Sequence, residues 1–328
     1  MKRLLLSALL LVACTAQAQT NEAVIDRAQL PKAPAAPNAT SISSAAQGGD
    51  QDAGTQRVAQ RRSLPIKLFI SYDAQVYYTN NVFLTPRNPV DAVILANTLS
   101  VRAETPAWAV ANGLLTPSIG LTYQRYNHGL ETDDPVRKSL DFDSYGLPLN
   151  LGFRFGDNWE ANLGFTTTSI YRLNGPPDYH LIFRSYTPSL SLRKLVSLAA
   201  NQILTVSAGA DYAFTKAGTA STPTISEDRN DKYDFFANVG YYYIRGKWTL
   251  GPYASVTRSI YRDYEEFGPT SVGRRDTTCS VGASVSYNFT PWATARVFTS
   301  FDWRNSTSQL YTYDAANAGV GATLSASF

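Results

Sequence analysis

The stretch Ala318-Gly319-Val320-Gly321-Ala322-Thr323-Leu324-Ser325-Ala326-Ser327-Phe328 closes the chain with an unbroken alternation of apolar and small side chains. A period of two is the pattern of a β-strand, because successive side chains of a strand point to opposite faces of the sheet. The last residue of the chain is aromatic. These features predict a terminal strand that separates two different solvents.

The same alternation recurs upstream in segments bounded by clusters of Gly, Pro, Asn and Asp. The polar faces carry mainly Gly, Ser, Thr and Asn, whereas the outer face of a soluble sandwich is rich in Lys and Glu. The predicted fold is all-β. An even number of such strands is typical of a closed antiparallel up-and-down transmembrane β-barrel. A secreted or periplasmic all-β protein is the alternative. The twelve expected strands are residues 66–79, 92–104, 114–126, 139–155, 159–172, 181–194, 203–215, 232–244, 247–261, 276–289, 293–304 and 311–328.

The connections between these segments alternate in length, which predicts an orientation. Short turns are expected at 156–158, 245–246 and 290–292, and long polar loops at 127–138, 216–231 and 262–275. Bacterial barrels have short periplasmic turns and long extracellular loops. Two connections on the periplasmic side, 105–113 and 195–202, are longer than this rule expects.

Aromatic residues near the expected strand ends fit two interfacial girdles. On the periplasmic side these are Trp108, Trp159, Trp248 and Trp292, and on the outer side Tyr78, Tyr123, Tyr171, Tyr212, Tyr233 and Trp303.

The amino-terminal region reads as a signal peptide followed by a leader. Lys2 and Arg3 precede an apolar run, and a small-residue cleavage pattern ends at Ala18, so residues 1–18 are the expected signal peptide. Lipidation at Cys14 is the alternative. Residues 19–64 are rich in Ala, Pro and Gln, which predicts a disordered periplasmic leader before a barrel at 65–328. A short helix around 57–62, or a segment threaded into the lumen as a plug, are alternatives.

Composition excludes several classes of protein. No stretch after the signal reaches the roughly 18 apolar residues of a transmembrane helix. Cleavage after Ala18 leaves Cys279 as the one cysteine, so no intramolecular disulfide is expected. The net charge of +3 does not indicate a nucleic-acid partner.

The chain resembles bacterial outer-membrane β-barrels in its terminal strand and in its final residue, Phe328. The resemblance implies an outer-membrane location, Phe328 as an assembly signal read by the barrel-assembly machinery, and contact with lipid and lipopolysaccharide. Thr79-Asn80-Asn81-Val82-Phe83 and Asp91-Ala92-Val93 are similar to the opening of a family of bacterial β-barrel porins found near exopolysaccharide genes. That family supplies no catalytic residues to carry over.

Catalysis is not expected, because the chain has only two histidines, both in expected loops. An outer-membrane phospholipase would need a Ser/His pair on the outer wall, for which His180 and Ser169 are the candidates. An outer-membrane protease would need paired carboxylates and a histidine at the barrel mouth, and the candidates are Asp133, Asp134, His128, Glu227 and Asp228. We expect no metal and no cofactor.

The expected function is a narrow porin-like channel for small polar or anionic solutes. The alternatives are a structural or envelope-assembly barrel and a barrel associated with polysaccharide export. Across the turn at 156–158 we expect Arg154 to pair with Glu160. Arg102, Arg193 and Arg296 have no such hairpin partner, so they are expected to carry most of the positive potential of the periplasmic half and to favour anions. The expected pore-lining residues are Asp73, Arg102, Arg154, Glu160, Arg172, Arg193, Asp211, Asp234, Arg296, Asp302 and Arg304.

Overall fold

The computed structural model describes residues 23–28, 66–173, 179–217, 230–262 and 273–328, most of which lie in strands. Short helical elements occur at residues 23–28, at α3 (Pro135–Lys138) and at the 3-10 helix η1 (Gln309–Tyr311). No helix among the described residues is long and apolar enough to cross a bilayer. The strands are β1 (Lys67–Thr79), β2 (Ala92–Glu104), β3 (Trp108–Val110), β4 (Gly113–His128), β5 (Phe142–Phe155), β6 (Trp159–Arg172), β7 (His180–Ala199), β8 (Gln202–Ala217), β9 (Lys232–Arg245), β10 (Trp248–Tyr261), β11 (Arg275–Thr290), β12 (Ala293–Ser306) and β13 (Tyr313–Ser327).

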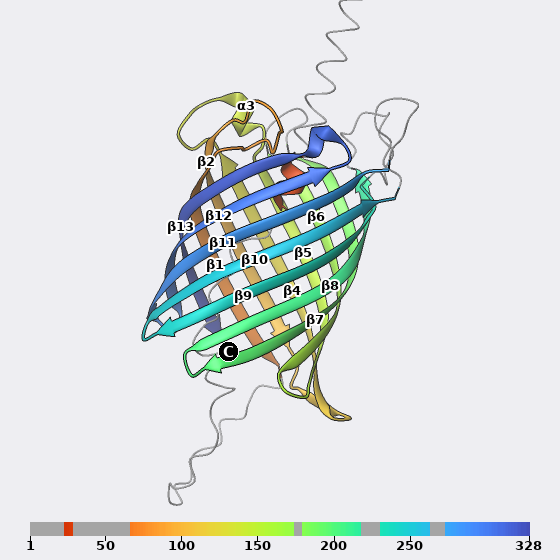
Figure 1. Cartoon of the computed structure of the whole chain (residues 1–328), viewed down its shortest axis with the longest axis vertical. Coiled ribbons are helices and arrows are strands. Elements are labelled where there is room, and N and C mark those ends of the chain that lie inside the picture. The colour runs from red at the N-terminus through yellow and green to blue at the C-terminus, as the bar shows by residue number, and fades with distance from the viewer. Residues whose placement is uncertain (1–22, 29–65, 174–178, 218–229, 263–272) are drawn as a thin grey trace, which may run out of the picture.

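These strands form one antiparallel sheet that closes on itself, as the sequence predicts. β1 pairs with the last strand, β13, and β2 pairs with β4, which completes a closed up-and-down barrel of twelve strands. β3 is an additional short strand that pairs with β4 at one rim. The strands run obliquely across the wall (Figure 1). Closure pairs the backbone groups of every barrel strand, which is the condition for strands to cross hydrocarbon.

The two rims of the barrel differ in their connections. At one rim, named here the turn end, tight turns join β5 to β6, β7 to β8, β9 to β10 and β11 to β12. Gly156 and Gly246 in these turns have φ values of 49° and 59°, a region that favours glycine. The opposite rim, the loop end, carries α3 and η1 (Figure 1). By the length rule for bacterial barrels, we expect the turn end to face the periplasm.

The seam between β1 and β13 includes the last residue of the chain. The backbone N–H of Phe328 donates to the Leu68 carbonyl at 2.9 Å, and the Leu68 N–H donates to the Phe328 carbonyl at 3.1 Å. Further along the seam, Tyr72 stands opposite Leu324. The carboxyl-terminal residue therefore contributes backbone hydrogen bonds to barrel closure.

Three segments differ from the predicted strand pattern. The strand expected from residue 139 begins at Phe142, because the Asp134 side chain caps α3 and the chain stays in that helical turn. η1 similarly delays the start of the last strand to Tyr313. The longer connection expected at 195–202 is a tight turn, since β7 and β8 extend almost to each other.

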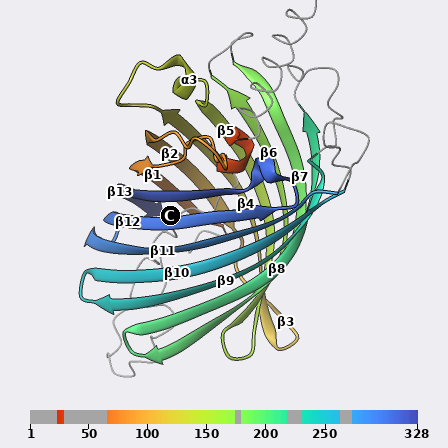
Figure 2. The ribbon, with the colours of Figure 1, turned by 45° about the horizontal axis from the view of Figure 1, so that its top comes forward.

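Residues 23–28, named here the lumen helix, lie inside the ring of strands at the loop end (Figure 2, red). The prediction of a disordered periplasmic leader is wrong for these residues, and the alternative of a segment threaded into the lumen describes them. Their apolar side chains bury against the inner wall, and this packing offsets the entropy cost of ordering the segment. The buried cluster comprises Ala23, Val24, Ile25, Val82, Ala92, Ile94, Ala96, Tyr126, Leu140, Phe142, Ile170, Ile182 and Phe183. The signal peptide 1–18, residues 19–22 and residues 29–64 of the leader lie outside the described residues.

Candidate functional site: the lumen and its helix

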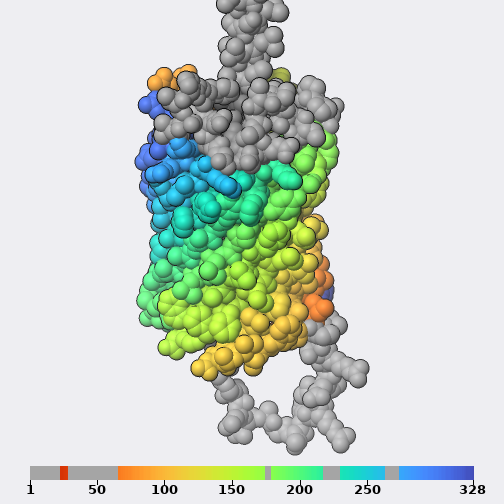
Figure 3. All heavy atoms as spheres, turned by 90° about the vertical axis from the view of Figure 1, so that its right-hand side faces the viewer, coloured from red at the N-terminus to blue at the C-terminus, as the bar shows by residue number. Residues whose placement is uncertain are grey.

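The outer wall of the barrel carries the exposed apolar side chains. Along β9, Val239 is exposed outward, whereas Gly240 next to it is buried on the inner face. The same alternation gives exposed Leu121 on β4, Leu163 on β6 and Val297 on β12. On the side that carries β7 and β8, this wall is a closed surface of oblique bands (Figure 3). A belt of this kind around a closed barrel has hydrocarbon as its solvent.

The chain is an outer-membrane β-barrel. Its expected girdle residues fall on the outer face near the rims. At the turn end Trp108, Trp248 and Trp292 are exposed, and the Lys194 ammonium lies 5.0 Å from the centre of the Trp159 ring. At the loop end the rings pack in pairs: Tyr123 with Tyr145 at 5.2 Å, Tyr145 with Tyr171 at 5.7 Å, Tyr212 with Tyr233 at 4.4 Å, and Trp303 with Phe301 at 5.7 Å, while Tyr78 is exposed.

The inner wall near the turn end, named here the turn half of the lumen, holds one shared carboxylate. Glu160 stands in register between Arg154 on β5 and Arg193 on β7. The Arg193 guanidinium reaches it at 2.5 Å, whereas Arg154 remains 4.0 Å away. The predicted Arg154–Glu160 pair is thus the weaker of the two, because Glu160 has two neighbours in the register and the β7 arginine makes the closer contact.

Arg102, Arg193 and Arg296 have no partner across a tight turn, as expected, but each has a carboxylate partner elsewhere, so none of them is a free positive charge. Arg102 lies 3.1 Å from Glu104 on its own strand. Arg296 makes a bidentate pair with Asp73 across the seam, with nitrogen to oxygen distances of 2.7 and 2.8 Å. Gly321 lies between them on β13, and a Cβ there would crowd the Gln75 side chain at 3.1 Å while only contacting the Arg296 guanidinium carbon at 3.4 Å. The odd or even position of a residue along a strand indicates the face on which its charge lies. It does not identify an ion-pair partner two strands away.

Aromatic side chains on the inner wall were missed by the sequence analysis, which assigned only polar residues to the lumen. A Cβ at Gly282 would come within 2.7 Å of the Tyr253 ring, and one at Gly209 within 2.5 Å of the Phe236 ring. The signal that could have found them is an inward glycine directly opposite an inward aromatic residue in the strand register. Such cross-strand pairs are Phe236 with Gly209, Tyr253 with Gly282, and Tyr77 with Gly319.

The inner wall near the loop end, named here the loop half, is filled by the lumen helix. Arg27 of the helix is 4% exposed and ties it to the end of β1 and the following segment. Its Nε donates to the Val82 carbonyl at 2.8 Å and its Nη2 to the Asn81 carbonyl at 2.5 Å. The Thr79 hydroxyl accepts a longer bond of 3.4 Å. Charged donors to backbone carbonyls, combined with the apolar packing, hold the helix in one position.

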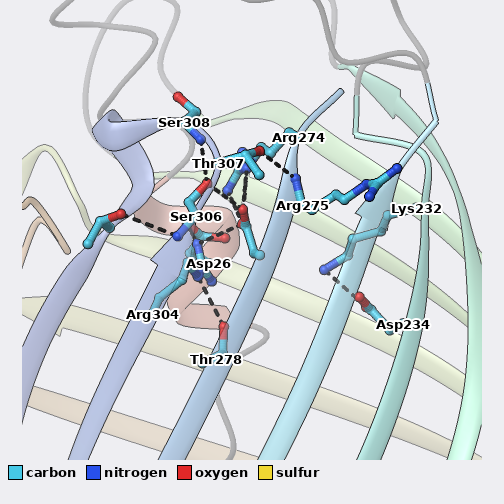
Figure 4. A network of polar contacts seen from close by, with 12 residues as sticks. Asp26, Lys232, Asp234, Arg274, Arg275, Thr278, Arg304, Ser306, Thr307 and Ser308 are labelled. Atoms are coloured by element: carbon cyan, nitrogen blue, oxygen red, sulfur yellow. Dashed lines mark hydrogen bonds and ion pairs between the residues drawn. The ribbon is translucent and has the colours of Figure 1, made fainter. Parts of the chain in front are cut away.

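A second attachment of the helix runs through Asp26, which points at Arg304 of β12 (Figure 4). The Asp26 Oδ2 lies 2.7 Å from the Arg304 Nη1, and Asp276 lies 3.8 Å from the same nitrogen. Arg274 pairs with Asp276 at 2.7 Å. Burial alone would raise the pKa of the Asp26 carboxyl, but Arg304 and Arg274 outweigh it and hold that pKa below its ordinary value. Asp26 is therefore a largely buried side chain in its charged form.

The remaining expected pore-lining residues also lie on the inner face of the loop half. Asp211 and Asp234 stand opposite each other in the register, and Asp234 pairs with Lys232 at 3.1 Å. Arg172 is buried and donates to a backbone carbonyl at 2.9 Å. Asp302 is buried and accepts hydrogen bonds from Ser280, Ser300 and Asn317. Asp234, Arg172 and Asp302 are therefore engaged with neighbouring groups in the wall, while Asp211 faces a second carboxylate.

Among the described residues, the structure does not pair the two phospholipase candidates, His180 and Ser169. Ser169 stands opposite Arg184, whose Nε donates to its hydroxyl at 3.1 Å, while His180 stands opposite Arg172. His128 is the last residue of β4 and is buried beside Tyr126, so its predicted placement in a loop is wrong, because the strand extends two residues further than expected.

The acidic candidates of the protease hypothesis have other partners. Asp134 caps α3, and exposed Asp133 pairs with Lys138 at 2.5 Å. Glu227 and Asp228 lie outside the described residues.

No protein-family model and no curated protein matches this sequence. Solved structures with a similar fold include an outer membrane channel from Pseudomonas putida F1, with 12% identity, 83% of this chain and 100% of that chain covered, and a TM-score of 0.49. The translocator domain of the autotransporter NalP from Neisseria meningitidis has 15% identity over 81% of this chain and 90% of its own, with a TM-score of 0.41. The NanC porin has 10% identity over 77% and 98%, with a TM-score of 0.41. At these values the similarities assign no function to the lumen.

Proposed function

We propose that the protein is a narrow outer-membrane channel for small polar solutes whose loop half is closed by the lumen helix. One observation carries the proposal: three of the four inward-facing arginines of the turn half remain in contact with water, whereas Arg296 is buried in its pair with Asp73. The side chains of Arg102, Arg154 and Arg193 are 52, 68 and 45% exposed although they lie on the inner face. Asn238, inward at mid-height on β9, is also exposed. A solvated lumen that is blocked at one end is the arrangement of a closed channel.

A mild preference for anions is part of the proposal. Arg154 is the least paired of the four turn-half arginines. Arg193 makes the close contact with Glu160, Arg102 pairs with Glu104, and Arg296 pairs with Asp73. One exposed and incompletely neutralised guanidinium gives the turn half a weak positive potential. That potential is smaller than the one expected from three unpaired arginines.

In this role the partners are outer-membrane lipid and lipopolysaccharide around the belt, the barrel-assembly machinery at Phe328, and small solutes in the lumen. The hydrogen bonds of Phe328 to Leu68 at the seam support a part for this residue in assembly.

Single-channel recordings in planar bilayers test the channel and its closure. Val24→Ser with Ile25→Ser removes apolar packing that holds the helix, and we name this full-length protein the release variant. We expect the wild type to be mostly closed and the release variant to show a several-fold larger mean current. Val136→Ser, at an exposed valine of α3, is the matched control and should leave the current unchanged. Absence of current from both the wild type and the release variant would contradict the proposal.

A further inference from the structure

We propose that the loop half of the lumen contains a binding site for an organic carboxylate, centred on Arg304, and that Asp26 occupies this site as an internal ligand. The inference rests on the proposed channel function and adds a ligand class to it. In this view the lumen helix closes the channel with a side chain that imitates the solute.

Arg304 has the features of an anion-binding group. Its residue is 8% exposed, so its charge is almost removed from water. Its Nε donates to the Thr278 hydroxyl at 3.1 Å, which fixes the plane of the guanidinium. The Nη1 group then points at Asp26, the carboxylate supplied by the helix (Figure 4). A planar guanidinium held this way is suited to a carboxylate.

The other acid beside Arg304 is already committed. Asp276 accepts from the Arg274 Nε at 3.0 Å and from the Arg274 Nη2 at 2.7 Å, and its second oxygen accepts from the Ser306 hydroxyl at 2.6 Å. It lies 3.8 Å from Arg304, too far for a hydrogen bond. When Asp26 leaves, Arg304 therefore loses its close carboxylate, and a buried charge without one is costly. A free carboxylate recovers that interaction.

The surroundings favour a single negative charge of modest size. The Tyr313 ring lies 4.9 Å from the Arg304 guanidinium and forms an apolar wall. Asp276 would repel a second negative charge, which disfavours a dianion such as phosphate. Only about 10 Å³ of cavity remains beside Asp26, Lys232 and Arg274, so a ligand enters the space that the helix itself vacates.

Isothermal titration calorimetry on the purified full-length protein in detergent tests the site. The probe is D-glucuronate, and D-glucose, which has a similar ring without the carboxylate, is the control. We expect glucuronate to bind the release variant weakly. Adding Asp26→Asn to it removes the internal competitor and should tighten binding about tenfold.

Two arginine variants then locate the site. In the release variant with Asp26→Asn, Arg304→Gln should abolish glucuronate binding, and Arg304→Lys should retain part of it. Arg258→Gln is the matched control, because Arg258 is an exposed arginine on the outer face of β10, also toward the loop end. It should leave affinity unchanged. Heat-modifiable mobility on gels establishes that each variant is folded.

Equal affinity for glucuronate and glucose, tighter binding of inorganic phosphate, or binding that survives Arg304→Gln would overturn the proposal. Unchanged affinity after Asp26→Asn would also overturn it. Calorimetry does not require conduction, so the two proposals fail separately. A release variant that conducts but does not bind glucuronate contradicts only the site, and one that binds but never conducts contradicts only the channel.

Discussion

The two halves of the lumen use the same kinds of charged residues in opposite ways. In the turn half, Glu160 faces arginines that are about half exposed or more. In the loop half, Asp276 and its partner Arg274 have side chains that are 1 and 2% exposed. The difference lies in what fills the space: water in one half and the lumen helix with its apolar cluster in the other. The same pairings are therefore weak and replaceable at one end and structurally essential at the other.

The largest predicted difference between the halves concerns stability. Asp276→Asn leaves Arg274 and Arg304 buried beside a neutral group and should lower the free energy of unfolding by about 3 to 5 kcal/mol. Glu160→Gln in the solvated half should lower it by less than about 1 kcal/mol. Urea unfolding in lipid vesicles measures both. Similar losses for the two variants would mean that the halves are equally wet.

A second comparison sets the inner wall against the outer wall at one height. Val239→Arg places a charge on the lipid face of β9 and should cost roughly 2 to 4 kcal/mol if it lies near the bilayer midplane. Asn238→Arg, one residue earlier, points into the lumen and should be nearly neutral, because Asn238 is exposed there. The same unfolding assay applies. Equal tolerance would show that the outer belt does not meet hydrocarbon.

Sequence periodicity predicted the barrel and the inward or outward position of most side chains, because both follow from a period of two. It did not predict the helix, since Ala23, Val24 and Ile25 are only three apolar residues in a leader otherwise suited to disorder. Nor did it predict the Arg296–Asp73 pair, which joins two strands separated by β13. An ion pair between strands that are not neighbours leaves no local pattern in the sequence. Neither does a short segment that becomes ordered only because it is buried against the barrel wall.

Selectivity should depend on the one exposed arginine in the turn half that lacks a close partner. Arg154→Gln in the release variant should shift the reversal potential under a salt gradient by a few millivolts toward cations. Arg296→Gln combined with Asp73→Asn removes a neutral pair and should leave it unchanged. Both shifts should shrink as added salt shortens the screening length. A larger shift from the pair than from Arg154 would restore a selective role to Arg296.

The smallest expected effect is that of pH on the closed state. The pKa of Asp26 in the folded protein lies below the ordinary 3.8, so its contribution is complete above that value and is lost as pH falls through the lowered pKa. The wild-type current should be flat from about pH 8 to pH 5 and rise only below about pH 3.8. In Asp26→Asn this acid rise should be absent. Opening of the wild type between about pH 5 and pH 7 would assign closure to another group.

The most direct test of closure is to lock the lumen helix in place and release it again. In the release variant that also carries Asp26→Cys, Arg304→Cys and Cys279→Ser, both the apolar packing and the native ion pair are absent, and a short bifunctional reagent that forms a disulfide with each thiol can join the two new cysteines. Single-channel recording should show an open channel before the reaction, a closed one after it, and recovery of the current on reduction with dithiothreitol. A protein that conducts equally when cross-linked, or in which the two positions cannot be joined, would contradict the account that this helix closes the loop half of the lumen.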